Sequence, residues 1–164
     1  MLNRLYANPI IPVIVIDDEN DACPLAEALL NGGIAVIEIT FRTQAAAGAI
    51  KAIKKEFPDL LLGAGTVITA DKAKAALDCG VDFALAPGTN PQIIRIFQEN
   101  NTLFIPGVMT PSDIELALAH NCTMLKFFPA ATAGGVKMLK AMSAPYLSMG
   151  IKFCPTGGIT IDNM

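Results

Sequence analysis

The sequence has almost no histidine and little charge. It contains no tryptophan, a single histidine, His120, and only 16% charged residues among its 164. One histidine excludes a metal site built from several histidines and any catalytic scheme that uses two of them. Catalysis must therefore rest on lysine, glutamate, arginine, threonine or a cofactor.

The cysteines also form no recognisable motif. Cys23, Cys79, Cys122 and Cys154 lie far apart, and no C-x-x-C pair occurs. This spacing argues against a zinc ribbon or a disulfide framework, and it is typical of a protein in a reducing compartment. We therefore expect a cytoplasmic protein without a bound metal.

Charge and hydropathy exclude two classes of partner. The net charge is −3, and the only basic cluster, Lys51, Lys54 and Lys55, is interpreted as a solvated helix face, so we expect no nucleic acid. The most apolar stretch, residues 9–16, is far shorter than the roughly 20 residues of a membrane-spanning helix, so we expect no membrane contact. A hydrophobic content of 52% instead predicts much buried structure.

Short apolar runs alternate with helix-like segments along the whole chain. We expect strands at 11–16, 35–40, 61–66, 83–86, 103–106, 124–127 and 152–156. Between them we expect helices at 21–30, 43–57, 71–79, 91–100, 111–119 and 135–142. This alternation predicts a parallel sheet covered by helices. Because units of about 20 to 28 residues fit seven times, we predict one domain over residues 1–164, a TIM (β/α)8-type barrel lacking the eighth strand-helix unit.

Glu38 interrupts an apolar strand. The alternation of side chains along residues 35–40 places Glu38, Thr40 and Arg42 on one side. A carboxylate in a covered strand is costly unless it is paired or used, because burial disfavours its charged form. Two interpretations stay open, an acid–base group and a structural Glu38–Arg42 ion pair.

Lys126 is the stronger anomaly, because bulky apolar residues precede and follow it in Met124-Leu-Lys-Phe-Phe-Pro129. Burial there favours the neutral amine, which is the form that attacks a carbonyl. The alternative is a lysine at a strand end whose ammonium reaches solvent.

The predicted strands end in small or rigid residues. Examples are Gly65-Thr66, Pro87-Gly88, Pro106-Gly107 and Gly157-Gly158. Such residues let backbone amides approach a ligand at the end of a barrel where sites form, although each is also an ordinary turn residue. The Gly157-Gly158 amides suit a phosphate. The run Gly63-Ala-Gly65 lacks the third glycine of a dinucleotide fingerprint, so we reject nicotinamide binding.

Six motifs in order resemble one enzyme family. They are Glu38-Ile-Thr-Phe-Arg42-Thr43, Gly63-Ala-Gly-Thr66, Pro87-Gly88, Ile105-Pro-Gly107, Lys126-Phe-Phe-Pro-Ala130 and Phe153-Cys-Pro-Thr-Gly-Gly-Ile159. The sequence resembles the class I aldolases of 2-keto-3-deoxy-6-phosphogluconate (KDPG), also described as 4-hydroxy-2-oxoglutarate (KHG) aldolases. The resemblance implies cleavage of KDPG to pyruvate and glyceraldehyde 3-phosphate in the Entner–Doudoroff pathway, or of KHG to pyruvate and glyoxylate. It also implies no cofactor and a homotrimer.

The resemblance implies a role for each matching residue. Lys126 matches the lysine that forms the Schiff base, and Glu38 matches the general acid/base. Arg42 matches the arginine that grips the keto-acid carboxylate, and Thr66 matches a threonine beside that carboxylate. Phosphate-binding or pocket-lining positions are matched by Gly157, Gly158, Pro87, Phe128 and Thr156.

The chain departs from the family pattern after its seventh predicted strand. The family's eighth strand, and a serine that follows it at the phosphate site, have no counterpart before Met164. One alternative is therefore a truncated, inactive barrel that retains only keto-acid or anion binding. Another is a phosphate-binding isomerase or synthase on the same fold, although such chemistry does not require a lysine at position 126.

Overall fold

The computed structural model describes residues 1–164 as an α/β fold in which all strands run parallel. The strands are β1 (Val13–Ile14), β2 (Val36–Thr40), β3 (Leu61–Gly65), β4 (Phe83–Leu85), β5 (Leu103–Ile105), β6 (Gly107–Val108), β7 (Met124–Phe127) and β8 (Lys152–Pro155). Hydrogen bonds link them in the orders β1-β2-β3-β4-β5 and β6-β7-β8. The prediction of a parallel, barrel-type α/β fold is confirmed.

The expected strand over residues 103–106 is divided at Pro106. Proline lacks the N–H that a strand ladder needs, so β5 pairs with β4 and ends before it. The Pro106 carbonyl accepts a 2.8 Å hydrogen bond from the Lys126 amide, and β6 continues beside β7. Seven strand segments are therefore present as predicted, one of them in two pieces.

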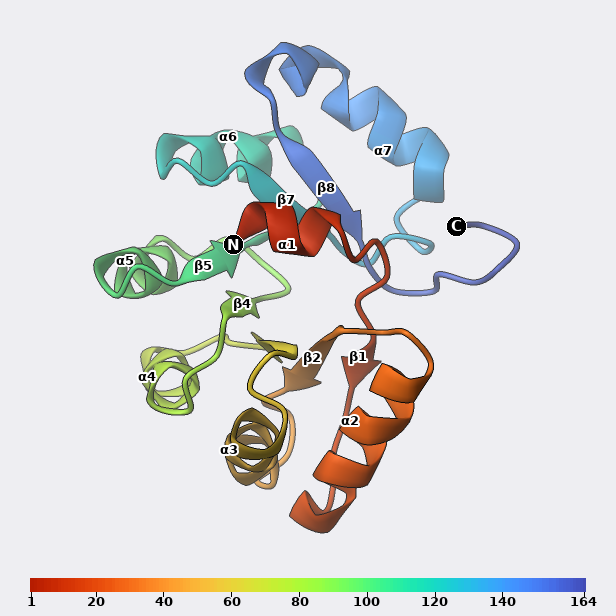
Figure 1. The fold of residues 1–164 in the computed structure, drawn as a ribbon. Coiled ribbons are helices and arrows are strands. Elements are labelled where there is room, and N and C mark those ends of the chain that lie inside the picture. Colours follow the sequence, from red (N-terminus) through yellow and green to blue (C-terminus); the bar gives the residue numbers. More distant parts are fainter.

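Helices surround the strands (Figure 1). Those between strands are α2 (Ala22–Asn31), α3 (Ala46–Glu56), α4 (Ala70–Asp78), α5 (Pro91–Glu99), α6 (Pro111–Ala119) and α7 (Gly135–Ser143), with short 3-10 turns at Glu19–Asp21 and Ala144–Met149. Thr69, Asn90 and Thr110 cap α4, α5 and α6, and their side chains accept backbone N–H hydrogen bonds. These caps fix where each helix begins after its strand. No helix is long and apolar enough to cross a membrane.

Successive side chains along each strand point alternately outward and inward, and this divides the core into an outer and an inner part. In β2, Ile37 and Ile39 belong to the large cluster packed against the helices. Val36 belongs to a smaller cluster inside the barrel, so Glu38 and Thr40 face inward as well. In β7, Leu125 and Phe127 face outward by the same rule.

A short N-terminal helix, α1 (Leu2–Tyr6), lies across one mouth of the barrel (Figure 1). Its Leu5 is buried in the inner cluster formed by residues from the strands, namely Val36, Leu61, Phe83, Leu85, Ile105 and Met124. Because several of these residues begin their strands, α1 closes the end of the barrel opposite the strands' carboxyl ends.

The barrel's hydrogen bonding is not continuous. Strand β1 pairs only with β2, and β8 pairs only with β7. In Figure 1, α2 and α7 flank this open side. Val13 has the same inward orientation as Glu38, with which it is in register, yet it stays 39% exposed. Strands β1 and β8 therefore each have a free edge that faces this open side.

Candidate active site

Two charged side chains meet inside the barrel. Glu38 comes from β2 and Lys126 from β7, and they are only 1% and 6% exposed. The Lys126 ammonium donates to the carboxylate, with Nζ 3.3 Å from Oε1 and 3.5 Å from Oε2. The structure thus pairs two residues that are 88 positions apart in the sequence.

This geometry decides between the interpretations that the sequence left open. Glu38 pairs with Lys126 and not with Arg42, so the Glu38–Arg42 ion pair is wrong. Arg42 follows the end of β2, where its side chain is exposed. The alternative in which Lys126 reaches solvent is also wrong, because the side chain is buried beside its partner.

Burial dominates the electrostatics of Glu38. It raises the pKa of the carboxyl above its ordinary value of 4.5, because removal from water penalises the charged form. The charge and hydrogen bond of Lys126, and the charge of Arg42, lower that pKa in part. The net effect is a pKa shifted upward, toward neutral pH, and a shift in this direction suits a carboxyl that acts as an acid–base group.

The segment that carries Arg42 is anchored on both sides. The Phe41 carbonyl accepts a 2.8 Å hydrogen bond from the Lys72 ammonium. The Thr43 hydroxyl donates to the Ile16 carbonyl. These two contacts hold the backbone around Arg42, while its guanidinium stays accessible to an anionic ligand.

Other predicted site residues follow the strands at the same end of the barrel. Thr66 comes after β3 with a φ of 58°, a left-handed conformation that is rare for a β-branched residue. Pro87 follows β4 and is exposed. The Phe128 ring lies beside the pair, with its centroid 5.7 Å from Lys126 Nζ. Thr66 and Pro87 make no hydrogen bond to Glu38 or Lys126.

The segment after β8 is tied to the segment after β7. The Ala130 and Ala131 amides donate to the carbonyls of Thr156 and Gly157 at 2.8 and 3.0 Å. Gly157 and Gly158 have φ values of 97° and 72°, which glycine adopts without steric cost. The three predicted residues Thr156, Gly157 and Gly158 therefore form one turn at the active-site end.

The sequence reasoning did not connect two residues, Gly65 and Cys154, with the pair. It named Gly65 only as a strand-end residue and Cys154 only as an isolated cysteine. A Cβ on Gly65 would overlap Oε1 of Glu38. Glycines two residues apart in β3 were a usable signal, since a glycine inside a strand often marks a close approach. Cys154 lies in register with Lys126, and burial raises the pKa of its thiol. No signal could place Cys154 there, because strand register cannot be read from one sequence.

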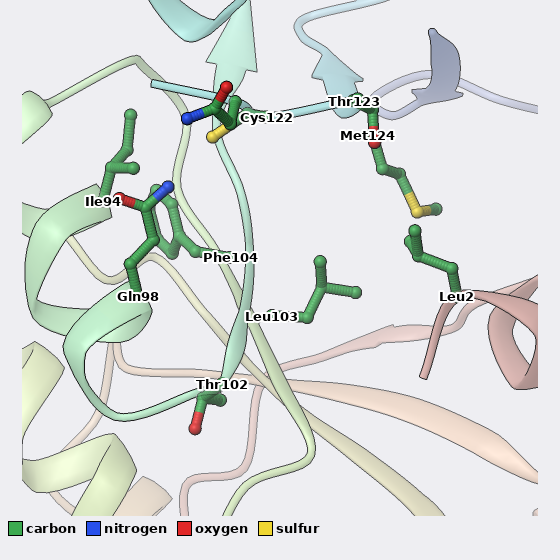
Figure 2. Close-up of a pocket in the computed structure, with 10 residues that line it drawn as sticks. Leu2, Ile94, Gln98, Thr102, Leu103, Phe104, Cys122, Thr123 and Met124 are labelled. Carbon is green, nitrogen blue, oxygen red and sulfur yellow. The ribbon is translucent and has the colours of Figure 1, made fainter. Parts of the chain in front are cut away.

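Neither a metal cluster nor the apolar pocket at the far end of the barrel competes with the pair as a catalytic centre. No three His, Cys, Asp or Glu side chains gather into a group that could hold a metal ion. Figure 2 shows a pocket of about 210 Å³ at the opposite end of the barrel, lined mainly by apolar side chains such as Leu2, Leu103 and Met124. None of the predicted site residues lines this pocket, so it is not the catalytic site.

A parallel barrel with a buried lysine–glutamate pair at its centre defines a class of enzyme whose candidate nucleophile is an amine. The family model for KDPG and KHG aldolase matches residues 1–164. The chain belongs to this family, and the resemblance noted in the sequence is confirmed.

Individual relatives agree with the family model. The chain is 44% identical over 164 residues to a 2-dehydro-3-deoxy-phosphogluconate aldolase of Haemophilus influenzae, covering 100% of the chain and 76% of the relative. It is 40% identical over 159 residues to the KHG/KDPG aldolase of Escherichia coli K12, covering 97% and 74%.

Solved structures agree as well. A KDPG aldolase from Legionella pneumophila, with pyruvate captured as a covalent carbinolamine intermediate, has a TM-score of 0.91 at 46% identity. That match covers 96% of this chain and 75% of the other. The protein is thus an enzyme, an aldolase, as predicted, and the isomerase or synthase alternative is disfavoured.

Proposed function

We propose that this chain cleaves KDPG to pyruvate and glyceraldehyde 3-phosphate through a Schiff base on Lys126, and that it also accepts KHG, releasing glyoxylate. The buried Lys126–Glu38 pair carries the proposal. A lysine next to a carboxylate can transfer its proton to that carboxylate and become the neutral nucleophile. The two groups are close enough for this transfer, at 3.3 Å.

The chemical steps follow from the two groups. The Lys126 amine adds to the C2 ketone to give a carbinolamine. The protonated Glu38 carboxyl then gives its proton to the departing hydroxyl, so that water leaves, an iminium forms and Glu38 is again a carboxylate. Glu38, through a water, takes the proton of the C4 hydroxyl as the bond between C3 and C4 breaks. The bonding electrons pass into the iminium, the aldehyde leaves, and an enamine remains. Protonation of the enamine at C3 and hydrolysis of the iminium release pyruvate and restore the amine.

The remaining residues bind the substrate in this proposal. Arg42 holds the carboxylate by paired charge-assisted hydrogen bonds, and Thr66 lies beside it. The amides of Gly157 and Gly158 hold the distal phosphate. Pocket walls are supplied by Pro87, Phe128 and Thr156.

Trapping with pyruvate and borohydride tests the nucleophile. Reduction of the iminium fixes one pyruvate on the reacting amine, and peptide mass mapping identifies it. We expect the added mass on Lys126 and its loss in Lys126→Met, while Lys137→Met, a change at an exposed lysine of α7, keeps the label. An unlabelled Lys126 in folded protein would contradict the proposal.

A second variant tests the acid–base group. Glu38→Gln should still be trapped with pyruvate and should lose cleavage by about 10² to 10⁴, the usual contribution of such a group. Unchanged turnover would refute the role of Glu38. Trapping without cleavage in the unaltered chain would instead favour a barrel that only binds keto acids.

We also expect a homotrimer and a cytoplasmic location. The four cysteines are free thiols in the structure, which suits a reducing compartment. Sedimentation analysis of the purified chain measures the oligomeric state, and a monomer would contradict the trimer.

A further inference from the structure

Strand β3 brings two glycines to the inner face of the barrel. In the β2–β3 ladder Gly63 is level with Glu38, and Gly65 is level with Thr40. The Glu38 side chain extends toward the carboxyl end of the strands, so its carboxyl lies against Gly65. A Cβ at Gly65 would overlap Oε1 of Glu38 and lie 2.7 Å from its Cδ.

The backbone does not require glycine at this position. Gly65 is absent from the residues with positive φ, so an alanine could adopt its conformation. The requirement is space, because any side chain would enter the volume that the carboxyl occupies. Gly65 therefore differs from Gly157 and Gly158, whose backbone conformations favour glycine.

On the β3 side, the Glu38 carboxyl is held by packing against Gly65. Its hydrogen bonds go to Lys126 alone, at 3.3 and 3.5 Å. A side chain at position 65 would force the carboxyl to rotate away, and the two distances from its oxygens to Lys126 Nζ would change. A shift of about 1 Å in a catalytic group is enough to reduce a rate markedly.

We propose that Gly65 is a positioning residue: the side chain it lacks leaves the space that holds the Glu38 carboxyl against the Lys126 amine. This inference rests on the proposed function, since it concerns how Glu38 is aimed. In this proposal Gly65 acts through Glu38, whose carboxyl a Cβ at this position would meet.

Gly63 provides a matched control in the same strand. A Cβ there would meet the ring of Phe83, which belongs to the inner apolar cluster, and not the carboxyl. Gly63→Ala and Gly65→Ala therefore both add a methyl group to the inner face of β3, but the first presses on Phe83 and the second on Glu38.

The experiment measures trapping, cleavage and pH profile for both variants. We expect Gly65→Ala to be labelled at Lys126 by pyruvate and borohydride, to lose at least about tenfold in kcat, and to shift the acid limb of the pH profile. Gly63→Ala should keep the pH profile of the unaltered enzyme. Equal kcat and an unchanged profile in Gly65→Ala would overturn the inference.

Shortening the carboxylate gives a rescue test. Glu38→Asp withdraws the carboxyl by one methylene, so Gly65→Ala should cost far less in that background than in the unaltered enzyme. An equal loss in both backgrounds, or a double variant that fails to fold when Glu38→Asp alone folds, would overturn the inference. Failure of the proposed function is distinguishable, because the unaltered enzyme would then not be labelled at Lys126.

Discussion

Replacing Lys126 with methionine measures the energy of the buried pair. Methionine is similar in length to the lysine stem and uncharged, so packing is largely kept. At 3.3 Å and an effective dielectric constant of about 20, the attraction between the two charges is about 5 kcal/mol. Removing one partner leaves the other charge buried, and such changes cost about 3 to 5 kcal/mol. We expect a loss of that size in the free energy of unfolding at about pH 7.5.

The loss should depend on pH in one direction. Burial already raises the pKa of Glu38, and Lys126→Met removes the strongest interaction that lowers it. Between the unfolded and folded pKa values, the folded state binds more protons, so stability falls as pH rises through that window. The destabilisation is therefore larger at neutral pH and shrinks as pH falls toward 4.5, the ordinary pKa of the carboxyl, because protonation then removes the buried charge.

Urea unfolding followed by circular dichroism at the two pH values gives the answer. The matched variant is Lys126→Met/Glu38→Gln, which leaves no buried charge and should lose less than the sum of the single changes. A Lys126→Met variant within about 1 kcal/mol of the unaltered protein at about pH 7.5 would refute the reasoning, since exposed pairs contribute that little. An equal loss in the free energy of unfolding at about pH 7.5 and at about pH 4.5 would also refute it.

Four further changes test other parts of the structure. The acid limb of the cleavage rate should lie above pH 4.5, because the ionised form of Glu38 takes the proton, and this limb should disappear in Glu38→Gln; a limb that persists contradicts the assignment. Gly158→Ala places a Cβ 2.6 Å from the Ala131 Cβ and should raise KM for KDPG about tenfold without changing KM for KHG, whereas equal effects on both would argue against a phosphate turn. Thr66→Gly should relieve its left-handed backbone and stabilise the fold by about 1 kcal/mol in urea unfolding while weakening keto-acid binding; a loss of stability contradicts this. Leu5→Ala should cost about 2 to 5 kcal/mol and leave borohydride trapping of the folded protein intact, because α1 closes the far end of the barrel.

The strands could be predicted because each of them coincides with a short run of apolar residues. Strand lengths were less predictable: residues 11–16 contribute only Val13–Ile14 to the ladder. Strand β1 pairs on one side only, so fewer of its residues meet a partner. The interruption at Pro106 was foreseeable from proline chemistry, since a residue without an N–H cannot continue a ladder.

Charged residues in apolar strands made the catalytic candidates visible. Glu38 and Lys126 stand out because burying a charge needs a reason, but the sequence suggested Arg42 as the partner of Glu38. Arg42 is near in sequence, whereas the pairing partner comes from β7, and only the closing of the barrel brings β7 opposite β2. Gly65 was noted as a strand-end residue but was not connected with Glu38, because that contact depends on how the Glu38 side chain extends in the folded barrel.

The floor of the barrel explains why the pair can be both buried and reactive. Leu5 and Phe83 belong to an apolar layer that closes the barrel below Glu38 and Lys126, so the pair is shielded from water on that side. Exclusion of water from below strengthens the interaction between the two charges and keeps the carboxyl's pKa raised. A side chain at Gly65 would enter the space that the carboxyl occupies above that layer. In this proposal β3 contributes to catalysis because it carries a glycine, with no side chain, next to the charged residues of β2 and β7.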